Sequence, residues 1–160
     1  MHFIFARPAL GMLAAVATLG WTATSHAQTS LSPLAGSWSG GGSIRLSDGR
    51  SERLHCRANY SARGGGGLGL SLRCASQSYK IDLRSSLAVR SDRVRGSWEE
   101  RSFNAGGDVV GSARSGALHL NFSGTMTGSM SVNFSNSSQR VSIKTDGGGL
   151  SSVSLSLSRS

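Results

Sequence analysis

The feature that most constrains this chain is a pair of alternating segments, each of which carries one of its two cysteines. Residues 52–60 contain Cys56, residues 68–74 contain Cys74, and four glycines at 64–67 lie between the two segments. In both segments apolar residues alternate with polar ones, which is the period of a β-strand with one buried face. The sequence therefore predicts an antiparallel hairpin with a glycine-rich tip.

This hairpin also predicts which residues face one another. With the chain folded about Gly65, the cross-strand pairs are Cys56 with Cys74, Ala58 with Leu72, and Tyr60 with Leu70. All six residues belong to one alternating set, so both cysteines lie on the same buried face. We expect a structural disulfide rather than a redox or metal pair, because the spacing is not that of a Cys-x-x-Cys motif. On the chain-entropy account such a bond stabilises the folded state by roughly 3 kcal/mol.

The same parity extends towards the N-terminus. Residues 36–46 carry apolar residues or glycine at even positions. The loop at 47–49 is predicted to have three residues with Gly49 left-handed, because a two-residue turn would put the apolar sets of the two strands on opposite faces. This register places Trp38 opposite Ala58, on the face that carries the cysteines.

Short alternating segments cover most of the remaining chain. They are 79–83, 87–89, 94–98, 109–112, 118–122, 126–134, 141–143 and 153–157. Turn-forming residues separate them, and no helical periodicity is sustained after residue 27. The predicted fold class is all-β: a single antiparallel up-and-down barrel or closed sandwich of about 8–10 strands with one disulfide.

The N-terminus has the pattern of a secretory signal. Arg7 precedes an apolar stretch at 10–19, and small residues at 25–27 indicate cleavage after Ala27. The apolar stretch is shorter than the roughly 20 residues that span a bilayer. We therefore expect a monomeric exported protein, periplasmic or extracellular, without a transmembrane segment. Its predicted parts are a signal peptide at 1–27, a short N-terminal segment at 28–35 and a single all-β domain at 36–160.

Two resemblances support this architecture. Gly36-Ser37-Trp38 resembles the Gly-x-Trp of the lipocalins, at the start of their first strand. The lipocalin resemblance implies a basic residue near the chain end that packs over this Trp and closes the barrel base, and Arg159 is the matching residue. A longer pattern resembles a group of small exported alphaproteobacterial proteins, and it implies compartment and fold but no activity. That pattern consists of residues 34–40, Cys56, Tyr60, residues 70–76 and residues 96–99.

The sequence predicts no catalytic residue, no metal site and no cofactor, and therefore no enzyme. His55 and His119 lie between apolar positions, so they face outward, and neither has acidic residues at metal-ligand spacing. The serines lack a nucleophile motif. Glu99 and Glu100 are adjacent in a strand, so they point to opposite faces instead of forming a carboxylate pair, and we expect both to form ion pairs with arginines.

The leading functional prediction is a non-enzymatic binding protein. Glycine and serine at inward positions leave room in a small barrel for one apolar or amphipathic ligand. Trp38, Tyr60 and Trp98 are predicted to line or seal this interior, with Arg159 as a fourth candidate.

The alternative prediction rests on charge. The chain has 17 basic and 8 acidic residues, a net charge of +9. Arg57, Arg73, Arg93 and Arg95 fall at outward positions, and Arg57 lies opposite Arg73. Such a face suits an anionic lipid or polysaccharide surface of the cell envelope. No nucleic-acid partner is expected, because aromatic residues are not interleaved with these arginines.

Overall fold

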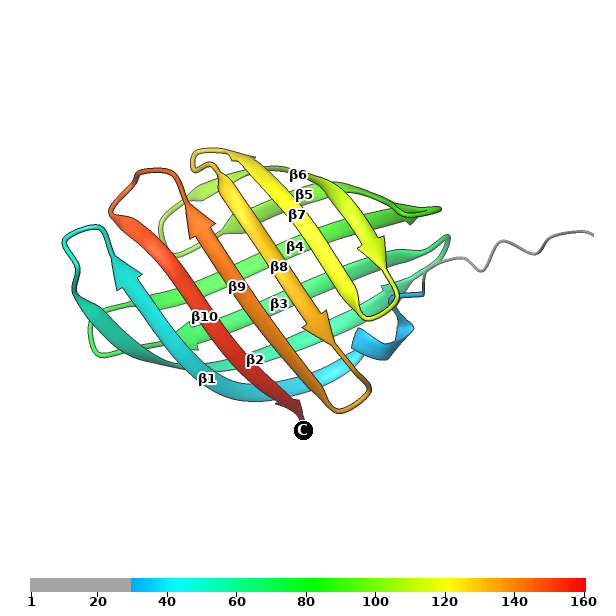
Figure 1. The fold of residues 1–160 in the computed structure, drawn as a ribbon, viewed down its shortest axis with the longest axis horizontal. Coiled ribbons are helices and arrows are strands. Elements are labelled where there is room, and N and C mark those ends of the chain that lie inside the picture. Colours follow the sequence, from blue (N-terminus) through cyan, green and yellow to red (C-terminus); the bar gives the residue numbers. More distant parts are fainter. Residues whose placement is uncertain (1–29) are drawn as a thin grey trace, which may run out of the picture.

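The computed structural model describes residues 30–160, and the predicted signal peptide lies outside this part of the chain. A single 3-10 turn, η1 (Ser32–Leu34), precedes ten antiparallel strands (Figure 1). The strands are β1 (Gly36–Leu46), β2 (Ser51–Arg63), β3 (Gly67–Ala75), β4 (Lys80–Arg90), β5 (Arg93–Glu100), β6 (Ala105–Arg114), β7 (Ala117–Gly124), β8 (Gly128–Phe134), β9 (Ser138–Thr145) and β10 (Leu150–Arg159).

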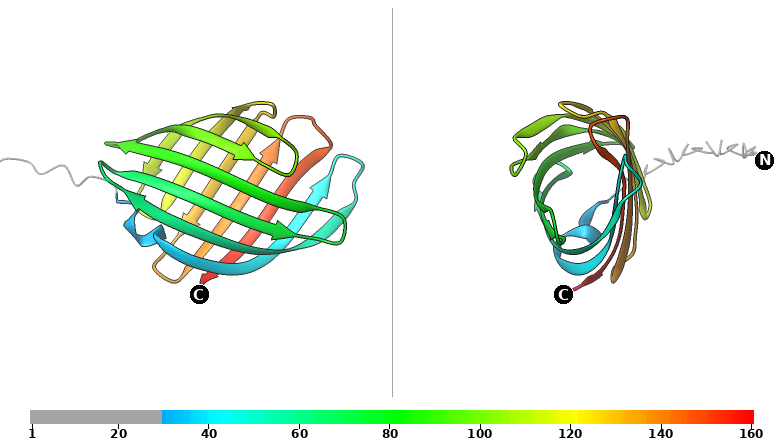
Figure 2. Two further views of the ribbon diagram at one scale, coloured as in Figure 1. Left: turned by 180° about the vertical axis from the view of Figure 1, so that it is seen from behind. Right: turned by 90° about the vertical axis from the view of Figure 1, so that its left-hand side faces the viewer.

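The strands form a closed up-and-down barrel. Each strand pairs with the next in the sequence, and β1 pairs with β10 to close the sheet. Figure 2 shows the β-strands from behind and from one end of the barrel. The predicted all-β class is confirmed, and of the two predicted arrangements the chain adopts the barrel.

One predicted boundary is wrong. Residues 79–83 and 87–89 were expected to form two strands, but residues 80–90 form the single strand β4, and Tyr79 lies in the loop before it. The apolar alternation is interrupted at Ser85, which occupies an inward position opposite Trp98. The Ser85 hydroxyl donates a hydrogen bond to the Ser97 carbonyl oxygen at 2.9 Å, so a polar residue continues the strand without an unpaired hydroxyl.

The register of the cysteine hairpin is confirmed. Cys56 pairs with Cys74, and Tyr60 pairs with Leu70, in the β2–β3 ladder. The two cysteines form a disulfide with a Cα–Cα distance of 4.1 Å. Their side chains are 4% and 6% exposed, which places the bond inside the barrel.

The loop between β1 and β2 also follows the parity argument. Gly49 has φ +87°, and its N–H donates to the Leu46 carbonyl oxygen at 3.0 Å. The N–H of Leu46 donates to the Arg50 carbonyl oxygen at 2.9 Å. This three-residue loop keeps both apolar sets on one face and places Trp38 opposite Ala58.

Close strand contact in the barrel depends on glycine. A Cβ at Gly42 would collide with the backbone carbonyl oxygen of Ser154 on β10, and one at Gly107 would collide with that of Ser123 on β7. Glycine at such points lets a strand bend sharply, which a small closed barrel needs. The curvature of β1 is visible in Figure 1.

The two ends of the barrel differ. We call the end that carries η1 and the C-terminus the closed end, and the opposite one, on the left of Figure 1, the open end. The closed-end loops comprise residues 64–66, 91–92, 115–116 and 135–137. The open-end loops comprise residues 47–50, 76–79, 101–104, 125–127 and 146–149.

Candidate functional site

The closed end is sealed around Trp38. This side chain is 1% exposed, and its indole N–H donates to the Leu34 carbonyl oxygen of η1 at 2.8 Å. The guanidinium carbon of Arg159 lies 4.5 Å from the Trp38 ring centroid, in a cation–π contact. The contact implied by the lipocalin resemblance is therefore present.

Arg159 joins three segments at this end. Its guanidinium group donates to the carbonyl oxygens of Pro33, within η1, and of Ala35, directly after η1, the latter at 2.8 Å. Its Nε donates to the carbonyl oxygen of Asn136 in the β8–β9 loop at 2.6 Å. These bonds hold the N-terminal segment against the end of the barrel, and several apolar side chains at this end are at most 1% exposed. They are Leu34, Leu68, Val89 and Val94.

Tyr60 lies at the closed end in a polar contact inside the core. Its hydroxyl donates to Oε1 of Gln139 at 2.8 Å, and Nε2 of Gln139 has no hydrogen-bond partner. Burial raises the pKa of Tyr60 well above its usual range, so the hydroxyl stays protonated. Gln139 was not predicted as a site residue, although its parity with Val141 makes it an inward position of β9.

The open half of the interior is apolar but incompletely covered. On β1 and β2 the apolar side chains near the open end, Ile44, Leu46 and Leu54, are buried. On β4, β5, β7, β8 and β9 six inward side chains are only partly buried: Ile81, Leu83, Trp98, Phe122, Met130 and Ile143. They form the open-half set. The predicted alternation places these positions inside the barrel. Of the set, only Trp98 was predicted to contact a ligand.

Trp98 is the member of this set with the least crowded neighbours. Its cross-strand partners are Ser85 on β4 and Gly107 on β6, so no large side chain stands beside it on either strand. Its indole N–H donates to the Ser123 carbonyl oxygen at 3.1 Å, and its ring meets Phe122 edge-on at 5.8 Å between centroids. The ring is thus fixed in orientation while part of its surface stays accessible.

The four residues predicted for the interior therefore divide between the two ends. Trp38, Tyr60 and Arg159 lie together at the closed end, and Trp98 lies in the open half. The structure brings Trp98 together with Phe122 instead, and no described contact joins it to the other three.

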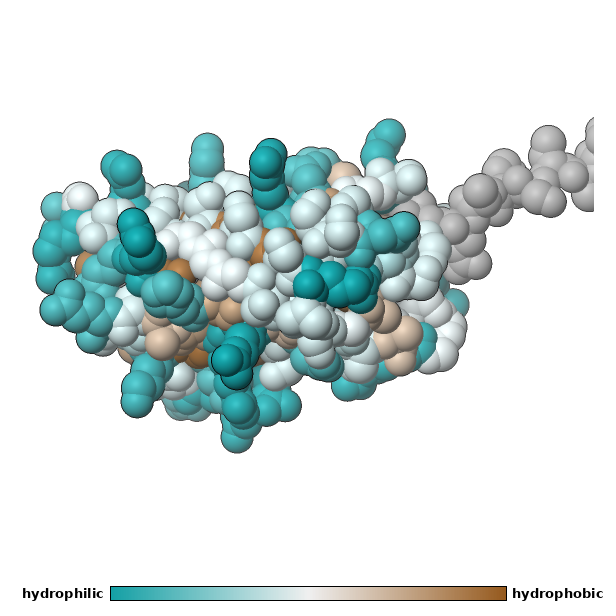
Figure 3. All heavy atoms as spheres, turned by 90° about the horizontal axis from the view of Figure 1, so that it is seen from below, coloured by the Kyte–Doolittle hydropathy of each residue, from teal (hydrophilic) through white to brown (hydrophobic). Residues whose placement is uncertain are grey.

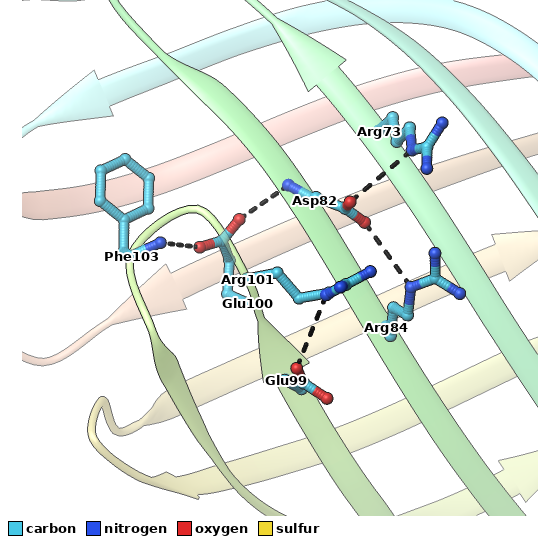
Figure 4. A network of polar contacts seen from close by, with 7 residues as sticks. All are labelled: Arg73, Asp82, Arg84, Glu99, Glu100, Arg101 and Phe103. Carbon is cyan, nitrogen blue, oxygen red and sulfur yellow. Dashed lines mark hydrogen bonds and ion pairs between the residues drawn. The ribbon is translucent and has the colours of Figure 1, made fainter.

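The rim of the open end contains a buried carboxylate. Glu100 is 9% exposed, and its two oxygens accept the backbone N–H groups of Asp82 and Phe103, each at 2.7 Å (Figure 4). Glu99 faces the other way and lies 3.8 Å from Arg101. The two glutamates do point to opposite faces, but only Glu99 lies in an arginine ion pair. Glu100 was expected to pair similarly and binds backbone instead.

The outer wall carries the basic residues. Every arginine and lysine between residues 30 and 160 is exposed, and Figure 3 shows hydrophilic side chains that project from a surface of intermediate and hydrophobic residues. Arg57 pairs with Arg73 across β2 and β3, as predicted. Arg73 also lies 3.7 Å from Asp82, and Arg84 lies 3.8 Å from the same carboxylate (Figure 4).

Within residues 30–160, no group of three or more His, Cys, Asp or Glu residues is placed to hold a metal ion. His55 and His119 are exposed on the outer wall. No helix in the described part of the chain is long and apolar enough to cross a membrane.

Comparisons with known proteins concern the fold alone. No protein-family model and no curated protein matches the sequence. Rv2717c from M. tuberculosis is similar in structure, with a TM-score of 0.67, 18% identity, and coverage of 81% of this chain and 94% of that one. The S-type phycobiliprotein lyase CPES from Guillardia theta has a TM-score of 0.56 at 14% identity, covering 80% and 88%. EF1p2_mFAP2b bound to DFHBI has a TM-score of 0.51 at 11% identity, covering 82% and 98%. The chain thus shares the architecture of natural barrels and of one that holds a small molecule.

Proposed function

We propose that this protein is a non-enzymatic carrier or sensor that binds one small apolar or amphipathic molecule in the open half of its barrel. The observation that carries the proposal is the contrast in burial along the interior. Most apolar side chains at the closed end are excluded from water, although Leu70 and Phe134 are partly exposed, whereas every member of the open-half set keeps contact with it. Apolar interior surface left exposed within a rigid barrel is the usual setting of a ligand site.

The charges around the interior narrow the ligand class. All described arginines and lysines are exposed, so a carboxylate or phosphate placed in the interior would lack a basic partner. The inward carboxylate of Glu100 is already occupied by two backbone N–H groups. We therefore expect an uncharged ligand whose polar atoms, where it has any, remain at the open end.

The structural neighbours support this proposal in one respect. EF1p2_mFAP2b, a barrel of similar architecture, is bound to DFHBI. A barrel of this shape thus accommodates a small molecule. At 11% identity the likeness does not extend to the ligand itself.

In this proposal the residues of the two ends have different roles. Trp98 and Phe122 would contact the ligand, and the space beside Trp98 would receive it. Trp38, Tyr60 and Arg159 would seal the closed end, so that the ligand enters and leaves through the open end.

A blocking substitution tests the proposal. Ser85→Leu puts a larger side chain beside Trp98, at an inward position, and Ser86→Leu makes the same change at the adjacent outward position. Titration of the folded protein with Nile red, an uncharged apolar dye, should show saturable binding that Ser85→Leu weakens about tenfold or more. Ser86→Leu should bind like the unaltered protein. Equal binding by both variants, or no saturable binding by the unaltered protein, would contradict a ligand site in the open half.

A further inference from the structure

One loop at the open end presents an aromatic side chain to solvent. Within residues 30–160 two large apolar side chains are exposed, Phe103 at 59% and Val110 at 51%. Phe103 lies in the loop between β5 and β6, at the open end, whereas Val110 lies on the outer wall of β6. A single exposed apolar side chain is ordinary on a protein surface, so the case for Phe103 depends on the ring and the charges near it.

The loop holds Phe103 in this exposed position. The Glu100 carboxylate accepts the Phe103 N–H at 2.7 Å, and its other oxygen binds the N–H of Asp82 on the neighbouring strand (Figure 4). Charge-assisted bonds of this kind are among the stronger ones in proteins. Asn104, next in the chain, has φ +51°, a conformation that completes a tight loop. The Tyr79 ring, from the loop between β3 and β4, lies 6.5 Å from the Phe103 ring.

Two basic residues adjoin these aromatic residues in the sequence. Lys80 follows Tyr79 in the chain and Arg101 lies two residues before Phe103, and both are exposed. The only ion pair of Arg101 in the described chain is with Glu99 at 3.8 Å, and both of these side chains are more than half exposed. Such a pair is weak and exchanges readily with other partners. We call Tyr79, Lys80, Arg101 and Phe103 the aromatic rim.

We propose that the aromatic rim docks this protein on an anionic phospholipid bilayer, with Phe103 inserted among the headgroups. An aromatic side chain between basic ones matches the chemistry of that surface, since the ring enters the interface and the cations meet phosphates. The net charge of +9 over the whole chain favours the approach to such a membrane. A protein partner is less suited, because a specific protein interface buries about 1,200 Å² or more and the apolar part of the rim is two rings.

The docking places the open end of the barrel against the membrane. An apolar ligand could then pass between bilayer and barrel without crossing water. The docking itself does not depend on the ligand, so it is tested with the protein alone and goes beyond the proposed binding function.

Sedimentation with lipid vesicles tests the proposal. The oxidised, folded protein should bind vesicles of phosphatidylcholine and phosphatidylglycerol in equal parts, bind phosphatidylcholine vesicles weakly, and lose binding as salt increases. Phe103→Ser should lower the affinity about tenfold. Val110→Ser, the matched control at the other exposed apolar side chain, should leave it unchanged. Lys80→Ser with Arg101→Ser should lower it several-fold.

Other outcomes would overturn the proposal. Equal binding by the Phe103→Ser and Val110→Ser variants would show that the rim is not the contact. Loss of binding in an Arg57→Ser, Arg73→Ser double variant, with Phe103→Ser unaffected, would assign the contact to the outer basic wall. Because all these side chains are exposed, unfolding curves should be unchanged. Nile red binding by Phe103→Ser should also persist, which separates failure of the docking from failure of the ligand site.

Discussion

The closed and open ends of this barrel are built from the same ten strands and the same alternation, yet they differ in what fills and covers the interior. At the closed end η1, Trp38 and Arg159 close over large apolar side chains that have almost no exposure. At the open end no segment of the described chain covers the interior, and serine or glycine stands beside Trp98. The closed end is therefore packed and covered, whereas the open end keeps accessible apolar surface although the disulfide and Leu54 lie buried near it.

The largest test of this contrast compares the tryptophans at the two ends. Trp38→Ala should lower the free energy of unfolding by about 3–5 kcal/mol, because it removes a fully buried ring together with its hydrogen bond to η1. Trp98→Ala should cost less than half as much, since its ring is partly exposed, but it should abolish Nile red binding. Urea unfolding and dye titration measure the two effects.

The contrast would fail if both substitutions destabilised the protein equally. It would also fail if Trp38→Ala, in conditions where the variant stays folded, weakened dye binding as much as Trp98→Ala. Either result would mean that the interior acts as one continuous site rather than as two halves.

The second test concerns the disulfide. Cys74 lies one residue before the end of β3, so the bond pins the hairpin near the open end. A double Cys56→Ser, Cys74→Ser variant should be less stable by about 3 kcal/mol, on the chain-entropy account for a separation of 18 residues. Hydrogen exchange should rise most in the loop between β3 and β4, because packing holds the closed end independently.

If exchange rose equally at both ends, the bond would be a global constraint and the two halves would not be energetically distinct. Hydrogen exchange of the unaltered protein before and after reduction of the disulfide is the matched control. Both routes remove the same covalent link, so they should give the same pattern.

Much of this fold was predictable from the sequence because parity constrains strands strongly. Two cysteines on one alternating set predicted the β2–β3 register, and the same rule predicted the loop with Gly49. A register error of one residue would have exposed every buried side chain, so the correct solution was nearly unique. The exception was β4, where Ser85 interrupts the apolar pattern and its hydroxyl is satisfied by a carbonyl on the next strand.

The candidate site was less predictable. Parity assigned Trp38 and Trp98 to the interior but not to opposite ends, because distance along the barrel axis depends on strand tilt and closure. The exposed Phe103 follows from the bonding of Glu100 to the loop backbone, which alternation does not encode. The closed-end partner of Tyr60 was missed because Gln139 is a polar residue at an inward position.

The third test removes that polar contact from the closed end. Tyr60→Phe leaves the buried amide of Gln139 without its hydrogen-bond donor, while Nε2 of the same amide already lacks a partner. The free energy of unfolding should fall by about 1–3 kcal/mol, the cost of a buried unsatisfied polar group. Adding Gln139→Leu should restore most of the loss, because an apolar side chain needs no partner. A double-mutant cycle by urea unfolding measures the coupling between Tyr60 and Gln139. If Tyr60→Phe left the free energy of unfolding unchanged, the closed end would tolerate the unpaired amide.

The smallest effect is expected at the open end, where polar contacts hold the turns. The hydroxyl of Ser76 and the backbone N–H of Ser78 donate to Glu52 at 2.7 and 3.0 Å, and these bonds lower the pKa of its carboxyl. A carboxylate whose pKa is lower in the folded state stabilises the fold above its ordinary pKa of about 4.3, and the contribution is lost as pH falls through the lowered value. Urea midpoints followed from about pH 7 to pH 3 should therefore decline slightly less for Glu52→Gln than for the unaltered protein. Glu99→Gln is the matched control, because its exposed carboxylate lies 3.8 Å from Arg101 and holds no turn. If the urea midpoint declined equally with pH in both variants, acid would destabilise the protein through its overall charge. The bonds from Glu52 to the turn would then contribute nothing to the stability of the open end.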